Sequence, residues 1–233
     1  MCLKNLSKEQ INSIVDLTIL VLTNLFAVYV CKYMINIDFD NFNLKVFFNF
    51  AFSEILFNIG LIFIMMIRKE NFASFGLVKK NSLKAVLLSF LVGLPLVVYG
   101  LYLYHCMGIK FIYLPLRGAV DPQLLRSLGL VQGIIAYIIV IIVWGFLEGL
   151  TYVAINDKVN KIFKPQNSFL NPGAIFCTLF VILIHILLNM STFDHIMTVI
   201  VAFILIYGML VIREYTQNSW GCIFLFIFFW NAF

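Results

Sequence analysis

The stretch IIAYIIVIIVWGFLE, residues 134–148, ends an apolar run of lipid-spanning character on a glutamate, Glu148. A second apolar stretch, IFCTLFVILIH at 175–185, ends on a histidine, His185. An ionisable group at membrane depth costs at least about 2–3 kcal/mol on insertion scales, so it is rare unless it is paired or used. An acid and a base on two different membrane helices therefore predict one shared, proton-handling site.

The composition favours a membrane protein. Hydrophobic residues make up 63% of the 233 residues, charged residues 12%, and the mean hydropathy is +1.02. A soluble domain carries about 25% charged residues, and a globule of this size could not bury so much apolar surface. The formal net charge of +5 is modest. We interpret it as positive loops facing a membrane leaflet and expect no nucleic-acid partner.

The apolar runs predict an all-α protein, a polytopic membrane helix bundle of about seven transmembrane helices that forms a single domain over residues 1–233. We expect the helices at 14–34, 44–67, 83–104, 128–154, 174–190, 196–212 and 220–233. The stretch 105–127 is typical of an external loop, and 156–171 is expected to lie along the interface.

The basic residues suggest an orientation. Lysines and arginines concentrate before the first helix and after the second, fourth and sixth. Because cytoplasmic loops carry an excess of such residues, the N-terminus is predicted to be cytoplasmic, in a multi-pass protein of the plasma membrane. The first apolar run is too long for the core of a signal peptide, so we expect it to be retained as a helix.

Glu148 is the first candidate for chemistry. It would act as a general base that activates water, or it would be a structural acid hydrogen-bonded to Tyr152 or Asn156. The adjacent Gly145 and Gly149 predict the close approach of another helix.

Four other polar positions lie in apolar sequence. His185 would accept a proton or donate a hydrogen bond, or would simply bond to a backbone carbonyl. Asn231, near the end of the chain, could stabilise an oxyanion or serve as a helix cap. Glu54 and Asn58 lie one turn apart on a predicted helix. Glu54 would be protonated and neutral, or would line the cavity as a second acid, and we favour an interhelical hydrogen bond.

The order of these residues resembles the CPBP family of intramembrane proteases, which includes CAAX prenyl endopeptidases and bacteriocin-processing or self-immunity proteins. That family shows Glu-Glu-x-x-x-Arg, then Phe-x-x-x-His, then His-x-x-x-Asn or His-x-x-x-Asp. The matching stretches here are 148–153, 181–185 and 227–231. Softer likeness at 75–80 and 207–220 extends the resemblance over residues 75–233.

The resemblance implies that Glu148 and His185 activate water for peptide-bond cleavage inside the membrane, while Asn231 helps to hold the oxyanion. Its substrate would be a membrane-associated peptide or a prenylated-type protein. The chain departs from the motifs at Gly149, Val153 and Ile227, where the family has glutamate, arginine and histidine.

The family is also described as metal-dependent, and a metal site usually needs three protein ligands. We therefore expect no cofactor and favour activation by glutamate over a bound zinc, with a metal left open. The departures support an alternative, a catalytically silent relative that acts as a membrane immunity or interaction protein. A small proton-coupled transporter is a third hypothesis.

Overall fold

The computed structural model describes residues 6–34, 42–108, 113–116, 127, 129–188, 199–200, 203–230 and 232. Within these ranges the side chains of residues 34, 42–51, 53, 54, 103 and 107 are not described.

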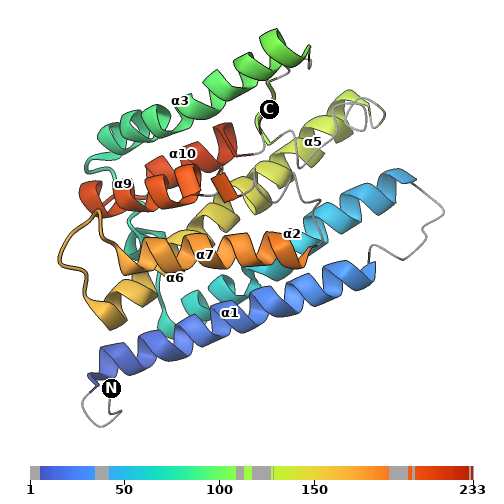
Figure 1. Cartoon of the computed structure of the whole chain (residues 1–233). Coiled ribbons are helices and arrows are strands. Elements are labelled where there is room, and N and C mark those ends of the chain that lie inside the picture. The colour runs from blue at the N-terminus through green and yellow to red at the C-terminus, as the bar shows by residue number, and fades with distance from the viewer. Residues whose placement is uncertain are drawn as a thin grey trace.

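The described chain is built from helices, and none of its residues forms a strand (Figure 1). The first three long helices are α1 (Lys8–Met34), α2 (Phe42–Arg68) and α3 (Ser82–Met107), with the short 3-10 helix η2 (Phe72–Phe75) before α3. The remaining elements are α5 (Leu130–Val140), η3 (Ile141–Glu148), α6 (Gly149–Phe163), α7 (Pro172–Leu187), η4 (Phe203–Tyr207), α9 (Gly208–Thr216) and α10 (Trp220–Phe228).

The all-α class is confirmed for the described residues, and a helix occurs in each of the seven predicted segments. Among the described residues, three stretches are long and apolar enough to cross a membrane, namely Lys8–Tyr33, Ser82–Cys106 and Leu130–Phe163. The apolar helices Ile55–Arg68 and Pro172–Leu187 are shorter. The last predicted helix is shorter than expected, because α10 ends at Phe228 and a turn follows.

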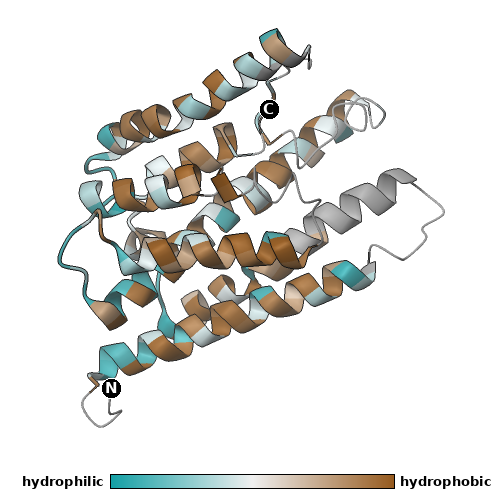
Figure 2. Cartoon of the chain, viewed as in Figure 1, coloured by the Kyte–Doolittle hydropathy of each residue, from teal (hydrophilic) through white to brown (hydrophobic). Residues whose placement is uncertain are grey.

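Hydrophobic residues predominate along the helices (Figure 2). Large hydrophobic side chains lie exposed on several helices, among them Phe26 on α1, Phe63 on α2, Leu91 on α3 and Leu179 on α7. Soluble monomers rarely expose contiguous apolar patches larger than a few hundred Å². Such a surface suits contact with lipid chains and supports a membrane protein.

Charged side chains are buried near one end of the bundle. Lys158 of α6 contacts Asp16 of α1 at 3.0 Å and Glu70, just after α2, at 2.8 Å. Arg68 joins Asp16 at 2.9 Å. The side chains of Lys158 and Asp16 are only 3% and 4% exposed, so the attraction between them is little screened by water.

A second group lies on the other side of α6. Arg213 of α9 binds Asp157 at 2.7 Å and Glu214 at 2.6 Å. Asn156 and Asn160 of α6 also donate hydrogen bonds to Glu214. Neighbouring residues 157 and 158 thus tie α6 to different parts of the bundle.

We call this region the charged end, where α1, α3, α7 and α10 begin and α2, α6 and α9 end. Gln10 near the start of α1 donates to the carbonyl of Ile162 near the end of α6 at 3.0 Å. Asn81, before α3, donates to the carbonyl of Thr216 at 3.0 Å. These ends gather on the left of Figure 1, on the side of the N-terminus.

The prediction that residues 156–171 lie along the interface is wrong for its first half. The helix continues to Phe163, and Asn156, Lys158 and Val159 are almost fully buried. The polar residues that suggested an interfacial segment have partners on α1, at Glu70 just after α2, and on α9. The charged residues enter the bundle because these partners replace water.

The close helix approach predicted from two glycines is confirmed. A Cβ at Gly145 would lie 2.5 Å from Cγ1 of Ile227, and one at Gly149 would lie 3.2 Å from Cδ1 of Ile223. Helix α10 therefore packs directly on the strip of α6 and η3 that leads to Glu148.

Replacing Lys158 by Met should destabilise the protein strongly. Asp16 and Glu70 would lose their shared cation, and breaking a buried pair from one side costs about 3–5 kcal/mol. The free energy of unfolding in mixed micelles, measured by titration with a denaturing detergent, tests this expectation.

Lys161→Met is the matched control. Lys161 lies one helical turn on, and its pair with Glu9 is exposed and 3.8 Å long, so its loss should change stability by no more than about 0.5–1 kcal/mol. Equal stability of the two variants would show that the Lys158 pair does not hold α6 in place.

Candidate functional site

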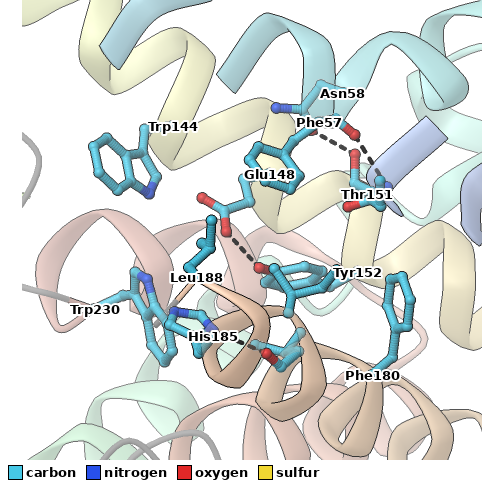
Figure 3. Close-up of a pocket in the computed structure, with 13 residues that line it drawn as sticks. Phe57, Asn58, Trp144, Glu148, Thr151, Tyr152, Phe180, His185, Leu188 and Trp230 are labelled. Atoms are coloured by element: carbon cyan, nitrogen blue, oxygen red, sulfur yellow. Dashed lines mark hydrogen bonds between the residues drawn. The ribbon is translucent and has the colours of Figure 1, made fainter. Parts of the chain in front are cut away.

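A pocket of about 90 Å³ lies between α1, α2, η3, α6 and α7, and has room for several water molecules. Both Glu148 and His185 line it (Figure 3). The other lining residues are Asn24, Phe57, Asn58, Trp144, Thr151, Tyr152, Phe180, Val181, Ile184, Leu188 and Trp230.

The helix that carries Glu148 is locally widened. Residues Ile141–Glu148 form η3, a π-helix between the α-helical segments α5 and α6. Such π segments inside α-helices occur frequently at functional sites. Trp144 and Glu148 are four residues apart and therefore lie on the same side of the helix, and both line the pocket.

The carboxylate of Glu148 is held by a residue of its own helix. The hydroxyl of Tyr152 donates a short hydrogen bond to Oε1 of Glu148. Both residues are buried, with 9% and 6% of their surface exposed. Tyr152 in turn packs edge-on against Phe226 of α10, with ring centroids 5.4 Å apart. The phenol is thus fixed, and it orients the acid.

A second set of hydrogen bonds supports the wall beside Glu148. Thr151 donates to Oδ1 of Asn58 at 2.6 Å, and the Asn58 amide contacts the carbonyl of Val143, inside η3, at 3.4 Å. Asn58 of α2 thus makes an interhelical hydrogen bond with Thr151 of α6. Asn24 of α1 donates to the carbonyl of Phe57, at 3.2 Å, and thereby joins α1 to α2.

His185 lies near the end of α7 and is partly buried. Its Nδ1 lies 2.9 Å from the carbonyl of Val181, one turn earlier. A carbonyl only accepts hydrogen bonds, so Nδ1 carries the proton in this contact. In the neutral ring the other nitrogen, Nε2, is therefore an acceptor. The ring packs edge-on against Trp230, with centroids 5.8 Å apart.

Of the three predicted site residues, two are brought together. Glu148 and His185 come from different helices and face one pocket. Asn231 lies outside the described residues, although its neighbour Trp230 lines the same pocket. The side chain of Glu54 is also outside the described part.

The pocket does not fit a metal site of the usual kind. Among the described residues, no group of three or more His, Cys, Asp and Glu side chains is placed to hold an ion. A catalytic zinc usually needs three protein ligands, and the described pocket lining provides Glu148 and His185.

Sequence reasoning missed several residues of the pocket. Tyr152 was considered only as a structural partner of Glu148, and the aromatic residues Trp144 and Trp230 were not considered. The spacing of four residues from 144 to 148 and from 148 to 152 was the available signal, because such residues share a helix face. Nothing local in the sequence indicates that Trp230 reaches the same place.

Comparisons of this chain with protein-family models, with curated proteins and with solved structures found no match.

Replacing Tyr152 by Phe should lower the free energy of unfolding by about 1–3 kcal/mol, because the buried carboxylate of Glu148 loses a hydrogen-bond donor. The exposed Tyr29 of α1 offers a matched control, since Tyr29→Phe should change stability by less than about 0.5 kcal/mol.

A double-mutant cycle isolates the pair. The change in the free energy of unfolding caused by Glu148→Gln and Tyr152→Phe together should differ from the sum of the two single-variant changes by at least about 0.5 kcal/mol. Strict additivity would contradict a direct energetic link between the two side chains.

Proposed function

We propose that the chain is a multi-pass protein of the plasma membrane, a bundle of about seven transmembrane helices with the charged end on the cytoplasmic side. The loops 69–81, 164–171 and 217–219 would lie on that side together with the start of α1. They carry Lys69, Lys79, Lys80 and Lys164, as the excess of positive charge in cytoplasmic loops requires.

We further propose that it is a divergent intramembrane endopeptidase of the CPBP type. The observation that carries this proposal is that Glu148 and His185, an acid and a base from two helices, line one pocket with room for several water molecules. Buried polar groups of this kind inside a lipid-exposed bundle are costly and mark functional sites by default. The motif resemblance supplies the class of reaction.

In the proposed reaction, a water in the pocket gives a proton to the carboxylate of Glu148 and attacks the carbonyl carbon of a peptide bond. The Tyr152 hydroxyl keeps the carboxylate in place. Neutral His185, with Nδ1 committed to Val181, accepts a hydrogen bond from the same water at Nε2. The proton held by Glu148 then passes to the leaving nitrogen as the carbon–nitrogen bond breaks.

The expected products are shortened membrane peptides or proteins. Their fragments should appear in a mass-spectrometric comparison of membranes from cells that do and do not express the chain. Glu148→Gln, which removes the base, and His185→Ala should each lower fragment yield by about 100-fold or more.

Glu9→Gln is the matched control for the acid. Glu9 is exposed at the charged end, so this variant should keep full activity. Undiminished fragments in well-expressed, folded Glu148→Gln protein would rule out the hydrolytic role.

A second candidate function is a catalytically silent CPBP relative that acts as a membrane immunity or interaction protein. The packing at two motif positions favours it. Gly149, where the family has its second glutamate, faces Ile223 and Phe226 of α10. Val153, where the family has arginine, is fully buried in the core. Neither position leads into the pocket.

For a silent relative, chemistry at Glu148 is dispensable. Cells that express Glu148→Gln should then resist a membrane-active bacteriocin as well as cells that express the unaltered chain, measured as the minimal inhibitory concentration. Loss of resistance with the folded variant would contradict this function.

A further inference from the structure

The charged end separates its acidic and basic side chains. The described acids Asp16, Glu70, Asp157 and Glu214 are all engaged in ion pairs in which each carboxylate side chain is at most 20% exposed. Their partners are one buried lysine and two arginines. Most of the carboxylates of this region are therefore neutralised by ion pairs inside the bundle.

The outside of the same end carries lysines in excess of acids, which we call the lysine rim. Its members are exposed and are Lys8, Lys69, Lys79, Lys80, Lys84, Lys161 and Lys164. Among the described residues of this end, the exposed acid is Glu9, whose contact with Lys161 is 3.8 Å long. Seven positive charges thus face one negative charge.

Bulky apolar side chains lie exposed beside the rim. Phe72 is 47% exposed, Phe163 is 63% exposed and Leu170 is 72% exposed. Tyr215 lies under the ammonium group of Lys84, 4.3 Å from its ring centroid. Aromatic rings next to lysines are typical of the boundary between lipid chains and headgroups. Lysine stems can run along apolar surface while their charges reach the headgroups.

We propose that the lysine rim is a binding surface for anionic phospholipid headgroups. Positive charge and exposed apolar groups occur together at this end of a bundle whose flanks are apolar. An anionic lipid satisfies both, since its phosphate meets the lysines and its chains cover the neighbouring rings. This surface is separate from the pocket, and the proposal depends on membrane residence but not on the hydrolytic activity.

The test uses the full chain in vesicles of phosphatidylcholine that contain a small fraction of spin-labelled phosphatidylglycerol or spin-labelled phosphatidylcholine. Electron spin resonance gives the share of each label immobilised at the protein. At low salt the phosphatidylglycerol label should associate at least about threefold more strongly. High salt should bring the ratio of phosphatidylglycerol to phosphatidylcholine association toward one, because salt screens exposed charges.

Replacing Lys79, Lys80, Lys84, Lys161 and Lys164 by glutamine should remove most of the preference. Arginine at the same five positions should retain it, which separates charge from folding. Lys32→Gln is the matched control, because Lys32 is exposed at the opposite end of α1. Equal association of both labels with the unaltered chain at low salt, or an unchanged preference in the folded glutamine variant, would overturn the proposal.

Discussion

The burial of Lys158 is the constraint on which the rest of the structure depends. Its ammonium group must stay paired inside the bundle, and Asp16 and Glu70 are the groups that pair it. These ion pairs join α6 to α1, through Asp16, and to the segment just after α2, through Glu70. Asp157, the preceding residue, is paired with Arg213 in a different part of the bundle. With both pairs formed, α6 has one rotation and one depth relative to its neighbours.

The rotation of α6 determines which side chains at its other end face the pocket. Glu148 lies ten residues before Lys158, or about 15 Å along an α-helix. Fixing α6 therefore also fixes the carboxylate, the Tyr152 hydroxyl that binds it, and the π-helical turn before it. Helix α10 completes the arrangement, because Gly145 and Gly149 let it pack closely behind Glu148. The ion pairs of the charged end thus position the polar pocket, although their residues do not line it.

Much of this organisation could be predicted from the sequence. The apolar runs predicted the helices, the two glycines predicted the close approach of another helix, and the rarity of ionisable groups at membrane depth pointed to Glu148 and His185. The interior of α6 could not be predicted, because Asn156, Asp157 and Lys158 look like a polar segment until their partners on other helices are known. The burial of Leu116, within a stretch predicted to be an external loop, is likewise set by distant parts of the chain.

The most direct measurement is a thiol cross-link between the two ionisable positions of the pocket. Cysteines would replace Glu148 and His185 in a chain whose own cysteines are changed to alanine, reconstituted in lipid. A short bifunctional methanethiosulfonate should join them efficiently, whereas a pair at His185 and the exposed Ile138 should not be joined. Failure of the first pair to link, with both thiols individually reactive, would contradict a shared site for the acid and the base.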